Sequence, residues 1–178
     1  MSWKTLDSRK IYDSPWITVF EDNVINPAGG KNIYGHVHFK GKAVAIVPLD
    51  DEGNTWIVGQ DRYTTHEYSW EVPMGGSDPG EEPLDTARRE PKEETGITAE
   101  NLTLIMRLHT SNSITDEEGF VFVARGLEIG EADFDEMEDL AIRKLPLAEA
   151  VDMVMRGEIT DAISVAALLR IAANQNMS

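Results

Sequence analysis

Three glutamates, Glu90, Glu93 and Glu94, lie close together in the chain, shortly after a glycine-rich segment. Side chains three and four positions apart share one face of an α-helix, so a helix here would gather these carboxylates into one small patch. Like charges at this spacing repel one another, and a divalent cation bound between them would relieve the repulsion. Such oxygen ligands suit Mg²⁺ or Mn²⁺. The alternative interpretation is a solvated acidic face that binds no ligand.

The residues around the glutamates favour the metal-binding interpretation. Residues 75–97 read GGSDPGEEPLDTARREPKEETGI, in which a glycine, an Arg-Glu pair, a Glu-Glu pair and a final Gly-Ile stand at defined separations. This pattern resembles the Nudix box of the Nudix hydrolases, and a motif that fixes so many positions is far more specific than a lone glycine motif. The resemblance implies an enzyme whose bound divalent metals activate water against a diphosphate.

The resemblance also assigns roles within the motif. It implies that Glu90 and Glu94 are the leading ligands of Mg²⁺ or Mn²⁺, and that Glu93 assists in metal binding and in catalysis. It further implies that Arg89 is a structural residue that forms a salt bridge with Glu81.

One position departs from the motif. Pro91 stands where the family usually has an aliphatic residue, and it lies between Glu90 and Glu93. Proline lacks an N–H donor and clashes with the preceding turn, which costs about 3 kcal/mol inside a helix. The sequence therefore predicts that the helix kinks at Pro91 or begins after it. Either change would move one ligand away from the others and weaken metal binding.

Two segments upstream of the motif extend the resemblance. Arg62 is followed by a tyrosine, and residues 70–76 read WEVPMGG. Both segments look like the ADP-ribose and nucleotide-sugar pyrophosphatase branch of the family. That likeness implies that Arg62 contacts the diphosphate, that Glu71 helps to hold the substrate, and that the backbone carbonyl of Met74 binds metal. A guanidinium can clamp phosphate oxygens through paired hydrogen bonds, whereas the alternative for Arg62 is an ordinary surface ion pair.

A polar loop over residues 110–118 is predicted to carry the general base. It lies between two apolar segments and is too polar for the core, so we interpret it as a functional loop. The resembling enzymes have a glutamate in such a loop that removes a proton from the attacking water. By that likeness, Glu117 is the first candidate and Glu118 the second. Glu136 and Glu138, in a later acidic stretch, are alternative bases.

The N-terminal residues are predicted to form short strands. Residues 16–20 and 33–39 alternate between apolar and polar side chains, and residues 26–30 form a turn between them. In the resembling branch, such strands form a small sheet that takes part in homodimerisation, and an aromatic side chain near the start of the chain stacks on a base. Trp16 and Phe20 are the candidates for this substrate contact, and ordinary packing is the alternative for both.

The remaining elements predict an α/β domain. Residues 43–49 and 56–60 are expected to form a core hairpin, and residues 101–108 and 119–124 two further strands. Helices are expected in the motif up to Gly96, over residues 146–157 and from residue 160 onwards. The predicted fold is a Nudix fold with a mixed β-sheet sandwiched between helices. It comprises a small antiparallel extension over residues 1–40 and a Nudix domain over residues 41–178.

Composition excludes several classes of function. The chain has 178 residues, a net charge of −16 and no cysteine, which rules out disulfides, thiolate zinc sites and cysteine nucleophiles. Its negative charge disfavours nucleic acid as a partner. It has no apolar run of membrane-spanning length and no signal-peptide core, so we expect a cytoplasmic protein without a membrane partner.

These observations together predict metal-dependent hydrolysis of nucleoside diphosphate sugars, including ADP-ribose-like substrates, to a nucleoside monophosphate and a sugar phosphate. Some ADP-ribose enzymes of the branch carry a proline in the loop after the box, and residues 110–118 contain none, which favours a broader substrate range. Two alternatives remain open. One is hydrolysis of dinucleoside polyphosphates or nucleoside triphosphates, and the other is a catalytically weakened nucleotide sensor.

Overall fold

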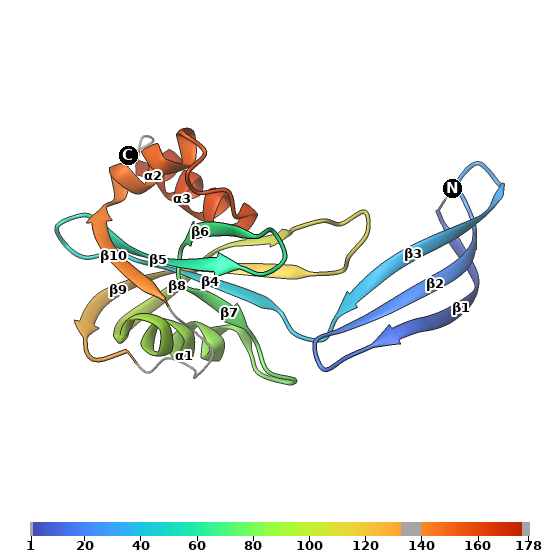
Figure 1. Ribbon diagram of the computed structural model, residues 1–178, viewed down its shortest axis with the longest axis horizontal. Helices are drawn as coiled ribbons and strands as arrows, with labels where there is room; N and C mark the ends of the chain where they lie inside the picture. Colours follow the sequence, from blue (N-terminus) through green and yellow to red (C-terminus); the bar gives the residue numbers. More distant parts are fainter. Residues whose placement is uncertain (1, 133–139, 176–178) are drawn as a thin grey trace.

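The chain forms an α/β body with a three-stranded sheet that extends away from it (Figure 1). The computed structural model describes residues 2–132 and 140–175. The N-terminal sheet contains β1 (Lys4–Asp13), β2 (Ile17–Ile25) and β3 (Lys31–Phe39). The elements of the body are β4 (Ala43–Pro48), β5 (Asn54–Arg62), β6 (Glu67–Glu71), β7 (Met74–Gly76), α1 (Pro83–Thr95), β8 (Ile97–His109), β9 (Glu118–Ile129), β10 (Ala141–Pro146), α2 (Leu147–Met155) and α3 (Ala162–Gln175).

The N-terminal sheet is antiparallel, in the order β1-β2-β3. The predicted turn connects β2 and β3, and the side chain of Asn26 accepts hydrogen bonds there from the backbone of Ala28 and Gly30. β1 was not predicted, because its sequence KTLDSRKIYD has no regular apolar alternation and the whole strand is exposed. The link between β3 and β4 includes the predicted boundary at residue 40, but a division into two domains there stays a prediction.

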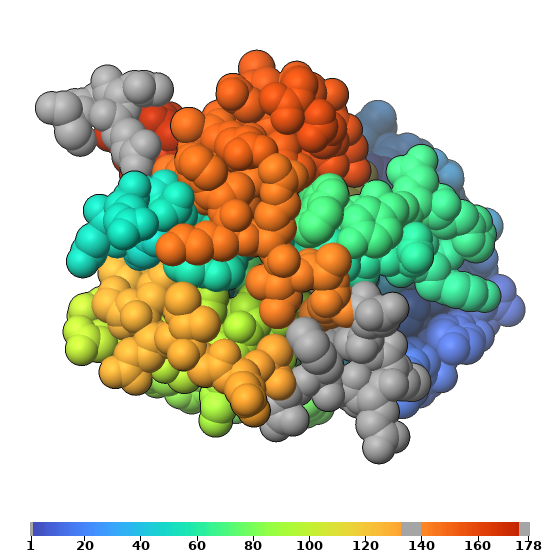
Figure 2. Space-filling model, turned by 60° about the vertical axis from the view of Figure 1, so that its left-hand side comes forward, coloured from blue at the N-terminus to red at the C-terminus, as the bar shows by residue number. Residues whose placement is uncertain are grey.

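The body has two sheets, in the orders β10-β5-β6 and β7-β4-β9-β8. Only β4 and β9 pair in parallel among the strands of the described residues. β4 is buried on both faces: Ala45 and Val47 pack in a core with α2 and α3, whereas Val44 and Ile46 pack in a second cluster with Ala87 of α1. The predicted mixed sheet between helices is therefore confirmed. Figure 2 shows one side of the body, with β10 and α2 in orange beside the β5–β6 hairpin in green.

The predicted hairpin of the fourth and fifth strands is wrong. The turn between them forms as expected, with the backbone of Asp50 bonded to that of Asn54, but the two strands enter different sheets. β4 pairs with β7 on one edge and with β9 on the other, and β5 pairs with β6 and β10. Because both hydrogen-bonding edges of each strand are occupied, neither edge is left for pairing between β4 and β5.

α1 does not begin after Pro91, as the sequence allowed, but runs from Pro83 to Thr95 with Pro91 inside it. Pro83 stands in the first turn, where proline is tolerated because its missing N–H would have no partner. The helix ends as predicted at Gly96, whose φ of 72° is left-handed. Pro91 is itself buried against the body. Burial of this helix face compensates for the hydrogen bond that the proline cannot donate.

The C-terminal part combines confirmed and missed elements. α2 and α3 occupy the predicted regions, and Asp161 caps α3 by accepting a hydrogen bond from the backbone of Ser164 at 2.7 Å. β10 was not predicted, although it completes the sheet beside β5.

The alternative bases Glu136 and Glu138 lie outside the described residues. No helix in residues 2–132 or 140–175 is long and apolar enough to cross a membrane, and the expected cytoplasmic location stays a prediction.

Candidate active site

The glutamates of α1 divide into two buried side chains and one partly exposed side chain. Glu90 is 8% exposed and Glu94 4% exposed, and both lie on the face of the helix that packs on the body. Glu93 lies between that face and solvent, with a side chain 41% exposed. Buried carboxylates are rare unless they are paired or bind a cation, so this face is not the solvated acidic surface of the alternative interpretation.

The glycine-rich segment is shaped around one of these carboxylates. A Cβ atom added to Gly75 would overlap the carboxyl group of Glu90, whereas one added to Gly76 would meet no atom within 4 Å. The motif therefore needs glycine at residue 75 for steric reasons. At Met74, the neighbouring residue, the backbone N–H donates to Glu94 at 3.0 Å. The two buried glutamates thus lie against consecutive residues of β7.

Arg89 connects the glutamates to the glycine-rich loop. Its guanidinium contacts Glu81 at 3.0 Å, Glu90 at 2.7 Å and Glu93 at 2.9 Å, and it donates to the backbone carbonyl of Gly76. The hydrogen bond to Arg89 lowers the pKa of Glu81 to about 2, and the same carboxylate raises the pKa of Arg89. The predicted salt bridge between Arg89 and Glu81 is confirmed, and the arginine also neutralises part of the charge on α1.

The donor set of this region fits a hard divalent cation. The carboxylates of Glu90 and Glu94 lie against Gly75 and Met74, and Glu93 shares the guanidinium of Arg89 with Glu90. Carboxylate oxygens are ligands that Mg²⁺ and Mn²⁺ prefer. Among the described residues, no three acidic or histidine side chains already converge at metal-binding distance. One nitrogen of Arg89, Nη1, donates to both Glu90 and Glu93.

Arg62, at the end of β5, and Glu71, at the end of β6, form a bidentate salt bridge. Nε of Arg62 donates to one carboxylate oxygen of Glu71 at 2.8 Å, and Nη2 donates to the other. The glutamate side chain is 3% exposed, whereas that of the arginine is 40% exposed. Hydrogen bonding to Glu71 and the charge of that carboxylate raise the pKa of Arg62, against an opposing effect of burial. The chain links this bridge to α1, because Met74, three residues after Glu71, donates its backbone N–H to Glu94.

The two predicted general bases take part in separate networks: Glu117 lies in the loop between β8 and β9, and Glu118 is the first residue of β9. Glu117 accepts a hydrogen bond from the hydroxyl of Thr110 within the loop. Glu118 pairs with two cations, Lys42 and Arg107. None of these three contacts involves a glutamate of α1. The shared site expected for the motif, Arg62 and the two candidate bases stays a prediction.

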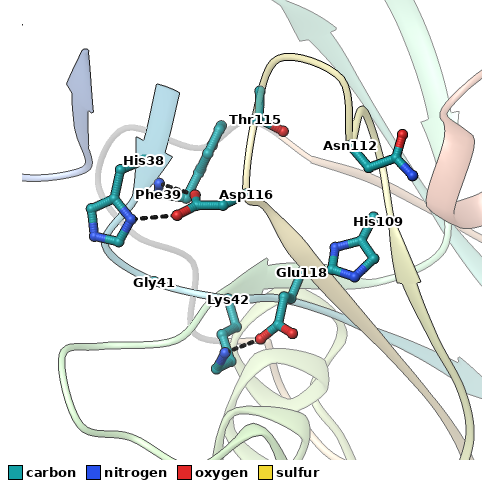
Figure 3. Close-up of a pocket in the computed structure, with 9 residues that line it drawn as sticks. All are labelled: His38, Phe39, Gly41, Lys42, His109, Asn112, Thr115, Asp116 and Glu118. Atoms are coloured by element: carbon teal, nitrogen blue, oxygen red, sulfur yellow. Dashed lines mark hydrogen bonds and ion pairs between the residues drawn. The ribbon is translucent and has the colours of Figure 1, made fainter. Parts of the chain in front are cut away.

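A cavity of about 450 Å³ lies between this loop and the end of β3 (Figure 3). Asp116 lies beside the end of β3, where its carboxylate is hydrogen-bonded to His38 at 2.6 Å and accepts the backbone N–H of Phe39 at 2.9 Å. Partial burial raises the pKa of Asp116, but the hydrogen bonds from His38 and Phe39 outweigh it and lower that pKa overall. The sequence did not predict that Asp116 and Lys42 line a common cavity, because residues far apart in the chain come together there only on folding.

The two aromatic candidates of the extension differ in their surroundings. Trp16 is 76% exposed in the turn between β1 and β2. Phe20 is partly buried and stacks on His36, with ring centroids 5.3 Å apart. Phe20 thus packs on His36, whereas Trp16 presents an open aromatic face. The substrate contact expected of either stays a prediction.

Comparison with known proteins agrees with this geometry. A family model described as the NUDIX domain matches residues 39–167, and a model described as the nucleoside diphosphate sugar hydrolase N-terminal domain matches residues 3–37. An ADP-ribose pyrophosphatase of Mycobacterium tuberculosis is 36% identical over 96% of this chain and 84% of its own length. An ADP-ribose pyrophosphatase of Bacillus subtilis is 35% identical over 89% of this chain and 86% of its own length.

A solved structure has the same architecture. The crystal structure of an ADP compounds hydrolase superimposes with a TM-score of 0.88 and 26% sequence identity, over 99% of this chain and 96% of the other. The likeness thus covers the N-terminal sheet as well as the body. From the motif, its buried glutamates and these matches, we conclude that the chain belongs to the Nudix hydrolase family.

Proposed function

We propose that the protein hydrolyses the diphosphate linkage of nucleoside diphosphate sugars, ADP-ribose-like substrates included, to a nucleoside monophosphate and a sugar phosphate. The observation that carries the proposal is the packing of Glu90 against Gly75 beside the bond from Met74 to Glu94. This arrangement holds two buried carboxylates at one place in a strongly acidic chain. The names of the two pyrophosphatase relatives and of the hydrolase structure support the substrate class.

Glu90, Glu94 and the backbone carbonyl of Met74 would hold the metal, and Glu93 would assist them. When bound, Mg²⁺ or Mn²⁺ would lower the pKa of a water ligand and neutralise charge on the phosphoryl oxygens. Arg89 would keep its bonds to Glu81 and to the glycine-rich loop, and so would fix the rotamer of Glu90. The family generally uses divalent ions, whereas the choice of Mg²⁺ or Mn²⁺ belongs to this proposal.

Arg62 would bind the diphosphate. Its bonds to Glu71 use Nε and Nη2, and the exposed part of its guanidinium can donate to phosphate oxygens. Glu71 is buried and therefore holds the guanidinium plane in one orientation, which lowers the entropy lost when substrate binds. As negative charge develops on the leaving phosphate, this fixed cation would stabilise it.

The general base would accept a proton from the attacking water as the water oxygen bonds to phosphorus and the anhydride P–O bond breaks. Glu117 is our first candidate. Glu118 is the weaker one, because Lys42 and Arg107 already engage its carboxylate. Glu136 and Glu138 remain candidates from outside the described residues.

The N-terminal sheet would make the enzyme a homodimer and contribute to base binding. β1 carries exposed apolar side chains at Leu6, Ile11 and Tyr12, which a second copy of the chain could cover. Trp16 has the open aromatic surface that stacking on a base requires. Light scattering coupled to gel filtration measures the mass directly, and a monomer at micromolar concentration would contradict this part of the proposal.

A panel of substrates with resolved products tests the proposed function. Nucleoside diphosphate sugars, dinucleoside polyphosphates and nucleoside triphosphates are each incubated with the full chain in Mg²⁺ or in Mn²⁺, and the products are separated by chromatography. We expect a nucleoside monophosphate and a sugar phosphate from the first class, at the highest kcat/KM. Preferred cleavage of the other classes would replace the proposed substrate. Ligand-induced stabilisation without turnover would instead indicate a nucleotide sensor.

A further inference from the structure

We propose that Ser164 is a positioning residue, which fixes the Glu71–Met74 segment and through it the bridge of Glu71 with Arg62. The inference rests on the proposed function and deepens it, since it adds to the site a residue that lies outside the sequence motif. Ser164 lies in the first turn of α3 and is fully buried. Its hydroxyl accepts a hydrogen bond from the backbone N–H of Val72 at 3.1 Å, across 92 residues of sequence.

The Glu71–Met74 segment needs such an anchor because it leaves one sheet and enters another. β6 ends at Glu71, and β7 begins at Met74. Between them, Pro73 has no N–H to donate, so Val72 provides the only backbone donor of the link. The carbonyl of Pro73 accepts a bond from Ile46 at 2.8 Å. Strand β4 thus holds Pro73 through Ile46, and helix α3 holds Val72 through Ser164.

Both ends of this link carry proposed functional groups. Glu71 directly precedes Val72 and binds Arg62, and Met74 follows Pro73 and donates its N–H to Glu94. A shift of Val72 would therefore move the carboxylate that orients Arg62 and the backbone that faces the glutamates of α1. Even small displacements of reacting groups reduce the rate of the chemical step strongly, also where substrate still binds.

The serine is itself held in place by the cap of its helix. Asp161 accepts the backbone N–H of Ser164 at 2.7 Å, which places the serine in the third position of α3. In a capping box, the side chain at this position returns to the cap residue. Here the hydroxyl of Ser164 reaches Val72 instead.

The test is a double-mutant cycle on kcat and KM of the full chain with a nucleoside diphosphate sugar. Ser164→Ala leaves the buried N–H of Val72 without its acceptor, and we expect kcat/KM to fall roughly tenfold, mainly through kcat. Glu71→Gln weakens the bridge to Arg62. If Ser164 acts through Glu71, the serine substitution should cost less than about twofold in the Glu71→Gln background. Multiplicative effects of the two substitutions would overturn the proposal.

Thr55→Val provides a matched control. The hydroxyl of Thr55 is also fully buried but has no hydrogen-bond partner among the described residues, so we expect kcat/KM within about twofold of wild type. Amide exchange of Val72, read by NMR, should accelerate in Ser164→Ala and not in the control. A Ser164→Ala protein with wild-type kcat and exchange would overturn the inference. Lack of turnover in the wild type on every nucleoside diphosphate sugar would instead remove the proposed function.

Discussion

The carboxyl group of Glu90 occupies the space in which a side chain at Gly75 would begin. This relationship joins the first residue of the motif to the helix that carries its acidic side chains. It explains in steric terms why glycine is needed at residue 75, and it fixes where the carboxylate of Glu90 points. The neighbouring Gly76 has open space instead.

Gly75→Ala should therefore abolish most activity, because the methyl group would push Glu90 out of its position. We expect kcat/KM to fall at least about 100-fold and the Mg²⁺ concentration for half-maximal activity to rise. Gly76→Ala is the matched control, since a Cβ there meets no atom within 4 Å. Steady-state kinetics over a Mg²⁺ series measures both. Equal activity of the two variants would show that the contact has no functional role.

Four single substitutions should identify the general base: Glu117→Gln, Glu118→Gln, Glu136→Gln and Glu138→Gln. The variant that lacks the base should lose kcat by about 100-fold or more and keep substrate affinity near that of wild type. We expect this result for Glu117. Glu118→Gln should mainly reduce stability, because it leaves Lys42 and Arg107 without their shared carboxylate. Loss of kcat in Glu136→Gln or Glu138→Gln alone would transfer the role to that residue.

Pro91→Leu should stabilise the protein and leave turnover nearly unchanged. α1 is continuous across Pro91, and Glu90 and Glu94 are both buried on its inner face. Leucine would restore a backbone donor that proline lacks, a gain of up to about 3 kcal/mol and an increase in Tm of several degrees. Calorimetry and kinetics on the same preparation provide the comparison. A rise in kcat or metal affinity above about fivefold would mean that Pro91 distorts the site.

The ion pair of Arg89 with Glu81 should stabilise the fold only above acidic pH. The pKa of Glu81 falls to about 2 in the folded chain from an ordinary value of 4.5. The carboxylate therefore contributes its full stabilisation above pH 4.5, and this contribution is lost as pH falls towards 2. Urea unfolding of wild type and Glu81→Gln should give different free energies of unfolding at pH 6 and converging values near pH 3. A constant difference across this range would contradict the assignment.

The parts of the fold and site that were predicted are those that local sequence determines. The motif, the end of α1 at Gly96 and the bond of Arg89 to Glu81 follow from residues close in sequence. The contact of His38 with Asp116 spans 78 residues, and that of Ser164 with Val72 spans 92. No periodicity or spacing encodes such contacts, because they arise only when separate elements pack.

The same reason explains the errors in strand assignment. β4 and β5 have the pattern of a hairpin, but strands distant in sequence occupy their edges. β1 and β10 are largely exposed and lack a buried face, so their sequences carry little alternation. Pairing with a neighbouring strand, rather than their own hydrophobic pattern, determines that they are strands.

The central claim is that Glu94 serves a metal-dependent hydrolysis at this site, and Glu94→Gln tests it most directly. Glutamine retains an oxygen that can accept the N–H of Met74, so the substitution removes the charge with little change of shape. Glu82→Gln makes the same change at an exposed residue just before α1 and serves as the control. In Mg²⁺, Glu94→Gln should form nucleoside monophosphate and sugar phosphate at least about 100-fold more slowly than wild type and the control. Product formation by Glu94→Gln at the wild-type rate would contradict the account.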